Sequence, residues 1–266
     1  MRCCDDASLC RNPGGAVALV GWVRRGRKVV KHIPGAARCR ECFLRWFHPQ
    51  YRSIRRLERL NVPGLLQPWA NTKRNRYPSM FQFVGWQLAA RPAPRILSFG
   101  CSTGEEVFSL ARYLPNAELI GIDINPYNIR RCLAQLAKAP HPGMQFLCSG
   151  SATDLESESF DAIFCMAVTR HGTLEAREPD RCDDVLPFAR FDSLVTQLAR
   201  CLKPGGYLVI WNSHFRFSDT HSAAGFDVVM NGPSHRTKTG PFYGTDNRRI
   251  DGPAYLEAVF RKHGGR

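Results

Sequence analysis

The sequence predicts an α/β fold built around a mostly parallel sheet, and two observations support this. From residue 95 onward, short apolar segments alternate with amphipathic segments at helical spacing. The apolar segments are continuous runs, which is typical of strands that are buried on both faces. The alternation of the two kinds of segment therefore predicts helices on both faces of one sheet.

The elements are expected in a regular order along the chain. We expect strands at 95–99, 118–124, 144–150, 160–167 and 207–212, and helices at 105–114, 126–138 and 191–202. Asn125 is expected to cap the second of these helices, with Pro126 at its first position. Residues 203–206, KPGG, are a predicted turn. Beyond Asn212 we expect a last helix and a hairpin, with 226–230 and 258–262 as its strands.

The first third of the chain is strongly basic. Residues 1–95 hold 19 of the 37 Lys and Arg residues but only 4 of the 23 Asp and Glu residues. We therefore expect two units, a basic Cys- and Arg-rich extension at 1–78 and a domain at 79–266 that begins with a helix capped by Ser79. Residues 45–60 predict a short basic amphipathic helix.

Three roles stay open for this basic helix: packing over the functional site, binding nucleic acid or an acidic protein, or contacting a membrane surface. The arm at 69–78 is expected to help cover the site. Its polar side chains are expected near the ligands: Asn71, Thr72, Arg74, Arg76 and Tyr77. No apolar run approaches the ~20 residues of a membrane helix, and no signal peptide is evident, so a cytoplasmic protein is expected.

The cysteines do not indicate a disulfide framework. There are 11 of them, an odd number without regular spacing, which favours reduced thiols. Cys39 and Cys42 form a C-x-x-C pair, which raises the alternative of a zinc site completed by Cys3, Cys4 or Cys10. Because no second pair has a regular spacing, no metal is expected.

The segment 96–115, ILSFGCSTGEEVFSLARYLP, carries the main functional signal. Gly100 and Gly104 lie at the joint between a strand and a helix, yet the spacing matches neither the dinucleotide fingerprint nor the P-loop. Glu105 and Glu106 follow at once, where an acid complements the helix dipole and suits an ammonium group rather than a phosphate. Asp123, at the end of the next strand, suits ribose hydroxyls. A ligand with an ammonium and a ribose but no phosphate fits S-adenosylmethionine.

These motifs resemble those of class I S-adenosylmethionine-dependent methyltransferases. GCSTGEE is similar to the first motif of the chemotaxis receptor methyltransferases, and IGIDI, FDAIFCMAV and LARCLKPGGYLVI are similar to later strands of the class. The resemblance covers about residues 93–215 and implies a Rossmann-like seven-stranded sheet. Residues 167–172, AVTRHG, depart from the chemotaxis enzymes, so receptor methylation is not expected.

The resemblance also implies a set of cofactor-binding residues. Glu105 would meet the ammonium of S-adenosyl-L-methionine, and Glu106 is expected to be a solvated helix residue. The full set is Phe99, Gly100, Cys101, Ser102, Gly104, Glu105, Asp123, Ile124, Asn125, Ser151, Ala152 and Met166.

His171 and His214 follow the fourth and fifth strands, so both are candidate catalytic bases, while Arg170 is an alternative clamp for an acidic acceptor. The leading expectation is methyl transfer to an oxygen or nitrogen of a small molecule. The alternatives are a protein or RNA methyltransferase steered by the basic N-terminus, and a protein that binds S-adenosylmethionine without turnover.

Overall fold

A computed structural model of the chain describes residues 48–69, 72–233, 240–252 and 255–264. Its contacts divide the chain into two compact units, Met1–Arg52 and Ser53–Arg266. The described part of the first unit is residues 48–52. The sheet and the candidate site lie in the second unit. The boundary expected between residues 78 and 79 stays a prediction.

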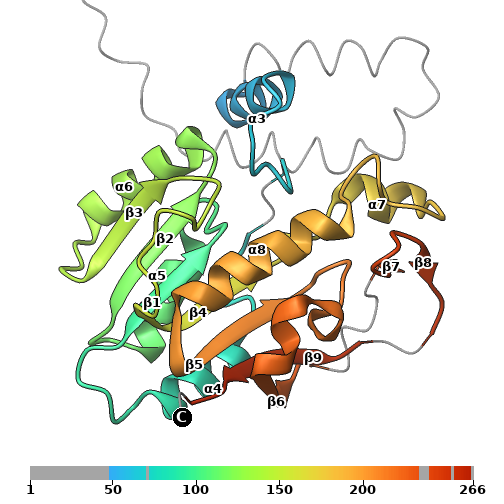
Figure 1. The fold of residues 1–266 in the computed structure, drawn as a ribbon. Coiled ribbons are helices and arrows are strands. Elements are labelled where there is room, and N and C mark those ends of the chain that lie inside the picture. The colour runs from blue at the N-terminus through green and yellow to red at the C-terminus, as the bar shows by residue number, and fades with distance from the viewer. Residues whose placement is uncertain (1–47, 70–71, 234–239, 253–254, 265–266) are drawn as a thin grey trace, which may run out of the picture. The chain divides into compact units, whose positions relative to one another are not determined.

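Helices and strands alternate along the second unit in the expected order (Figure 1). The α-helices are α3 (Pro49–Arg59, which begins in the first unit), α4 (Pro78–Gln87), α5 (Glu105–Tyr113), α6 (Pro126–Lys138), α7 (Gly172–Arg177) and α8 (Phe188–Cys201). The strands are β1 (Arg95–Phe99), β2 (Glu118–Asp123), β3 (Met144–Cys148), β4 (Phe160–Met166), β5 (Leu202–Trp211), β6 (Phe226–Asn231), β7 (Phe242–Tyr243), β8 (Arg249–Ile250) and β9 (Glu257–Lys262).

The main sheet has seven strands in the order β3-β2-β1-β4-β5-β9-β6. Strands β1 to β5 pair in parallel, and β9 pairs antiparallel with both β5 and β6. This confirms the Rossmann-like seven-stranded sheet and the hairpin expected at its end. The strand order reverses at β1, which lies between β2 and β4. In such sheets a ligand crevice forms there, beyond the carboxyl ends of the strands.

Two apolar layers hold the sheet, one on each face. Ile96 packs on one side with residues of α4, α5 and α6, while its neighbour Leu97 packs on the other side with residues of α8. Figure 1 shows α8 lying across that second face. Both side chains are fully buried, and each contributes about 1.5–3 kcal/mol through removal of apolar surface from water.

A buried carboxylate ties the amino-terminal end of β4 to its surroundings. Asp161 is 1% exposed. It accepts a hydrogen bond from the backbone N–H of Arg95 at 2.8 Å, and it forms ion pairs with Arg91 and with Lys203, whose Nζ lies 2.9 Å away. Two cations and one N–H offset the cost of burying this charge.

Two local expectations were wrong. The helix α4 begins at Pro78, and its capping residue is Tyr77, which makes no side-chain cap bond, so Ser79 is not the cap. Ser79 is instead the second residue of the helix, after Pro78, which suits the first helical position. The expected turn at 203–206 lies inside β5, where the pairing with β4 shifts register. The cap at Asn125 is confirmed, because its side chain accepts from the N–H of Tyr127.

The region after β5 also differs from expectation. In the part of the chain that the structure describes, no α-helix follows Asn212; two short 3-10 helices, η2 (Phe217–Asp219) and η3 (His221–Gly225), lead into β6. The polar stretch after β4, for which no element was expected, contains α7. His171 caps this short helix by accepting from the N–H of Thr173.

Candidate functional site

A partly enclosed cavity lies at the carboxyl ends of β1, β2, β3 and β4. It has a volume of about 950 Å³, including the part open to solvent. Residues between Leu57 and Phe81 form one wall, and the strand ends form the other. Most of the expected cofactor residues line it: Phe99, Gly100, Cys101, Ser102, Asp123, Ile124, Asn125 and Met166. Gly104, Glu105, Ser151 and Ala152 do not.

The glycine turn after β1 forms the floor of the cavity. Gly100 has a φ of +74°, a left-handed conformation that favours glycine. A Cβ at this position would lie 2.4 Å from Cγ2 of Val168, so the space admits no side chain. The N–H groups of Gly100 and Cys101 both donate to the carbonyl of Ile122, at 2.8 and 2.9 Å. The turn is therefore fixed to β2 before any ligand binds.

Asp123 connects the two strand ends that face the cavity. One carboxylate oxygen accepts from the N–H of Ser102 at 2.8 Å, and the other accepts from Asn125 N–H and Asn128 Nδ2, both at 2.9 Å. Burial raises the pKa of Asp123, and these three hydrogen bonds oppose that effect. Asp123 is only 8% exposed, and it lines the cavity.

Of the two glutamates at the start of α5, Glu106 lines the cavity and Glu105 does not, which is the reverse of the expectation. Glu106 lines the cavity and accepts from Ser98 Oγ at 2.8 Å, whereas Glu105 accepts from Thr103 Oγ1 at 2.6 Å and does not line it. Burial raises the pKa of Glu106 to about 7, while its hydrogen bond with Ser98 and the charge of Arg76 lower it. The expectation that Glu106 is solvated was wrong.

The end of β3 contributes backbone rather than the expected side chains. Ser149 and Gly150 line the cavity beside Ile124. A Cβ at Gly150 would lie 2.5 Å from Cδ1 of Ile124, so this glycine permits close contact. Ser151 and Ala152 are turned toward α8, where Gln197 Oε1 accepts from the hydroxyl of Ser151 and from the N–H of Ala152.

The wall opposite the strand ends comes from a segment without helical or strand periodicity. Arg190 Nη2 donates to the carbonyl of Leu65 at 3.1 Å, and Gln67 Nε2 donates to the carbonyl of Arg170. Sequence reasoning missed Lys73, which lines the cavity together with three members of the expected arm and wall: Thr72, Arg76 and Tyr77. Arg74 instead donates to Gln135 on α6, and Asn71 lies outside the described residues.

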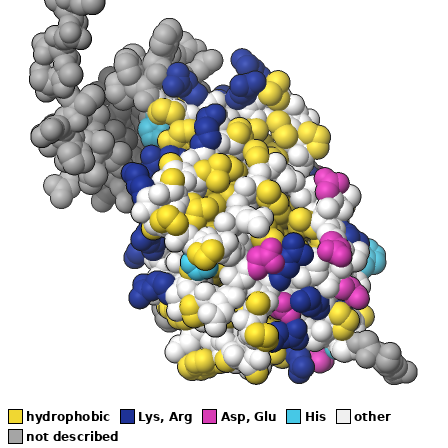
Figure 2. Space-filling model, turned by 90° about the vertical axis from the view of Figure 1, so that its left-hand side faces the viewer, with side chains coloured by type: hydrophobic (Ala, Val, Ile, Leu, Met, Phe, Trp, Pro, Cys, Tyr) yellow, Lys and Arg dark blue, Asp and Glu magenta, His cyan; other side chains and the backbone are white. Residues whose placement is uncertain are grey.

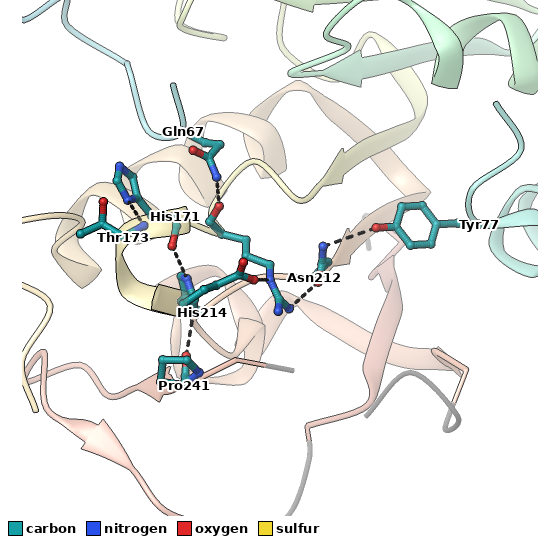
Figure 3. A network of polar contacts seen from close by, with 9 residues as sticks. Gln67, Tyr77, His171, Thr173, Asn212, His214 and Pro241 are labelled. Atoms are coloured by element: carbon teal, nitrogen blue, oxygen red, sulfur yellow. Dashed lines mark hydrogen bonds and ion pairs between the residues drawn. The ribbon is translucent and has the colours of Figure 1, made fainter. Parts of the chain in front are cut away.

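Neither candidate catalytic histidine lines the cavity. His214 is fully buried, with Nδ1 2.8 Å from the carbonyl oxygen of Pro241 and Nε2 3.2 Å from that of His171 (Figure 3). His171 uses Nδ1 to cap α7 through Thr173. Burial lowers the pKa of both histidines. The structure gives each a bonding role within the loops; their catalytic role stays a prediction.

Arg170 contacts residues of these loops and of β5, whereas the sequence suggested that it could bind an acidic methyl acceptor. Its guanidinium contacts Glu175 and the side-chain oxygen of Asn212, and Asn212 Nδ2 lies 3.5 Å from the hydroxyl of Tyr77 (Figure 3). Asn212, at the end of β5, has a φ of +61°. This backbone conformation directs its amide between the two partners.

Exposed basic side chains occur on two helices that each contribute residues to the cavity lining. α3 exposes Arg55, Arg56 and Arg59, and α6 exposes Arg130 and Arg131. The two helices are joined by a 2.6 Å hydrogen bond between Ser53 Oγ and Asn125 Oδ1. Figure 2 shows Lys and Arg side chains at the top and left of one face, with Asp and Glu toward its lower right.

Within the described residues, no group of three or more His, Cys, Asp or Glu side chains is placed to hold a metal ion. The candidate zinc ligands Cys39 and Cys42 lie outside those residues. No helix in the same part of the chain has the length and apolar character needed to cross a bilayer.

Comparison with known proteins finds a family model and several relatives that are similar to part of this chain. Residues 97–210 match the family model described as "Methyltransferase domain". Sterol methyltransferase-like 2 of Botryococcus braunii is 25% identical over 49% of this chain and 30% of its own length. Fatty-acid O-methyltransferase of Mycolicibacterium smegmatis is 29% identical over 54% of this chain and 46% of its own length. The chain therefore spans less than half of these two relatives.

Among solved structures, the plantazolicin methyltransferase BpumL in complex with SAH is similar, with a TM-score of 0.37 and 18% identity over 64% of this chain and 56% of that one. The match of residues 97–210 to the methyltransferase model agrees with the class I fold and the cofactor S-adenosyl-L-methionine expected from the sequence. The narrower similarity to chemotaxis receptor methyltransferases stays a prediction.

Proposed function

We propose that this protein transfers a methyl group from S-adenosylmethionine to an oxygen or nitrogen of a small-molecule acceptor. The observation that carries the proposal is that Gly100, Asp123 and Glu106 meet in one cavity at the carboxyl ends of the strands. A bare backbone turn, a ribose ligand and an ammonium ligand are thereby brought together.

The residues present fit the cofactor. Ser102 Oγ and Asn128 Oδ1 are buried at the cavity without hydrogen-bond partners in the described structure, so a ligand rich in hydroxyl and amino groups would satisfy them. Asp123 would accept from the ribose hydroxyls, and Ile124 with Gly150 would contact the adenine. Glu106, rather than Glu105, would accept from the ammonium.

The bound cofactor supplies an electrophilic methyl group on a sulfonium. The contribution of this chain is positioning: it holds the cofactor by both ends and leaves the space beside Met166 and Val168 for the acceptor. The two relatives act, by their names, on a fatty acid and on sterols, which supports a small-molecule acceptor.

The alternatives from the sequence remain distinct proposals. The exposed arginines of α3 and α6 support a protein or RNA acceptor, because such a surface attracts polyanions. The third alternative is a protein that binds S-adenosylmethionine without turnover. A cytoplasmic location stays a prediction.

Calorimetric titration with S-adenosylhomocysteine tests the cofactor site. Asp123→Ala should weaken binding about 10- to 100-fold, because it removes a charged acceptor from the ribose. Asp154→Ala is the matched control, since Asp154 is exposed and does not line the cavity. Thermal melting of both variants should be measured as well, because Asp123 also holds the glycine turn through the N–H of Ser102. Absence of binding to the folded wild-type protein would refute the proposal.

A further inference from the structure

The positive and negative side chains that line the cavity would not balance once a cofactor is bound. Lys73, Arg76, Glu106 and Asp123 carry the formal charges of the lining, two positive and two negative. Asp123 is already held by three donors at the ribose end. This leaves Glu106 and the two cations for the methionine end and the acceptor.

S-adenosylmethionine brings a sulfonium, an ammonium and a carboxylate. In the proposed complex, Glu106 would offset the ammonium, and Arg76, which lines the same cavity, would offset the cofactor carboxylate. Lys73 is then the remaining cation of the lining: it is exposed and has no hydrogen bond or ion pair within the described residues. An anionic acceptor would pair with the Lys73 ammonium, whereas a neutral acceptor would make no ion pair there.

Of the described residues that line the cavity, Glu106 has a pKa of about 7, and the ammonium of the cofactor would engage it. No histidine is among the described residues that line it, and the expected candidates His171 and His214 are bonded within their loops. The thiol of Cys101 is buried, and its pKa is raised well above the ordinary value, so it stays protonated. An acceptor that is already anionic needs no base.

Apolar side chains also line the cavity. They include Leu65, Pro68 and Val168, and Trp69, which also lines it, leaves 45% of its surface exposed. Exposed aromatic and aliphatic surface at a binding site suits an apolar ligand tail.

We propose that the acceptor is an apolar carboxylic acid whose carboxylate binds Lys73 and is converted to its methyl ester. The inference rests on the proposed methyltransferase function. One carboxylate oxygen bonds to the methyl carbon while the bond between that carbon and sulfur breaks. The electron pair of the broken bond stays on sulfur. Cation and anion become two neutral products, and no proton moves.

The test uses the full chain with methyl-deuterated S-adenosylmethionine and four acceptors: dodecanoic acid, dodecanol, dodecylamine and acetate. We expect a deuterated methyl ester of dodecanoic acid, detected by mass spectrometry and cleaved by mild alkali. Transfer to the alcohol, the amine and acetate should be at least about 10-fold slower, because they lack the charge or the tail. Equal or faster transfer to the alcohol or amine would overturn the inference.

Variants assign the role of Lys73. Lys73→Met should raise KM for dodecanoic acid about 10- to 100-fold, while Lys73→Arg, which restores the charge, should stay within a few fold. Lys138→Met, on the exposed end of α6, is the matched control. Affinity for S-adenosylhomocysteine should be unchanged in all three variants.

The two measurements separate the two proposals. Binding of S-adenosylhomocysteine without transfer to the acid, or an unchanged KM in Lys73→Met, would overturn the acceptor assignment and leave the cofactor site standing. Failure of S-adenosylhomocysteine to bind would remove the proposed function itself.

Discussion

Two adjacent glutamates give a sharp test of how the cofactor is held. Glu106→Gln removes the charge from the cavity but keeps an oxygen for the Ser98 hydroxyl, whereas Glu105→Gln makes the same change outside the cavity. At pH 7.0, Glu106→Gln should weaken binding of S-adenosylhomocysteine about 10-fold, the scale of one charge-assisted hydrogen bond. Glu105→Gln should change it less than about 2-fold. Calorimetric titration measures both.

The pH dependence follows from the raised pKa of Glu106. With a pKa of about 7, its ionised fraction rises from about 3% at pH 5.5 to about half at pH 7. Because the ammonium of the ligand prefers the ionised form, by about 20-fold if Glu106→Gln loses 10-fold at half ionisation, affinity in the wild type and in Glu105→Gln should rise about 7-fold over this range. Glu106→Gln should lose that rise. A slope that persists in Glu106→Gln would refute the assignment.

The same pKa has the opposite effect on the stability of the free protein. Folded Glu106 keeps a proton that the unfolded chain releases, so the free energy of unfolding falls as pH rises from about 4.5 to about 7, by at most about 3 kcal/mol. Without ligand, Glu106→Gln should therefore melt at a higher temperature than wild type at pH 8. Calorimetric melting at pH 5 and pH 8 measures this; an equal difference at both values would contradict it.

Two further substitutions test the frame of the site. Asp161→Ala removes the buried acceptor of the Arg95 N–H and the partner of two partly exposed cations, so it should lower the free energy of unfolding by about 1–3 kcal/mol in urea titrations. Exposed Asp154→Ala should cost less than about 0.5 kcal/mol, and an equally small effect at 161 would contradict the structural role of this carboxylate. Gly100→Ala places a Cβ 2.4 Å from Val168 and should abolish binding of S-adenosylhomocysteine. Gly172→Ala is the control, because among the described residues a Cβ there would meet nothing within 4 Å beyond its own chain neighbours, and it should bind the ligand as wild type does. Normal binding by Gly100→Ala would show that the turn is not the floor of the site.

The sheet could be predicted because its signals are local. Continuous apolar runs specify strands that are buried on both faces, and Asn125-Pro126 specifies a helix start whatever packs around it. Asp123 was identifiable for the same reason, since the end of a strand is marked by the change from apolar to polar residues.

The choice between Glu105 and Glu106 was not available from the sequence. Neighbouring helix positions point about 100° apart, and the one that faces the cavity depends on how α5 packs against β1. The bonding of the two histidines could not be predicted for a related reason. Their place after β4 and β5 was correct, but their orientation depends on contacts with α7 and Pro241, which lie at some distance in the sequence.

The cavity wall could not be predicted because it has no periodicity. Residues 64–69 are held by Arg190 and by the carbonyl of Arg170, more than one hundred residues away along the chain. No local pattern encodes such contacts. Lys73 was missed for this reason, although its neighbours Thr72 and Arg76 were expected near the site.

The two ends of the sheet treat buried carboxylates differently. At the amino-terminal end of β4, Asp161 is matched by two cations of its own chain. At the carboxyl ends, burial raises the pKa of both Glu106 and Asp123. Substitutions around Asp161 can therefore change the thermal stability of the protein without changing its affinity for the ligand. They do not alter Glu106 and Asp123, which gain a cationic partner only when a positively charged ligand binds.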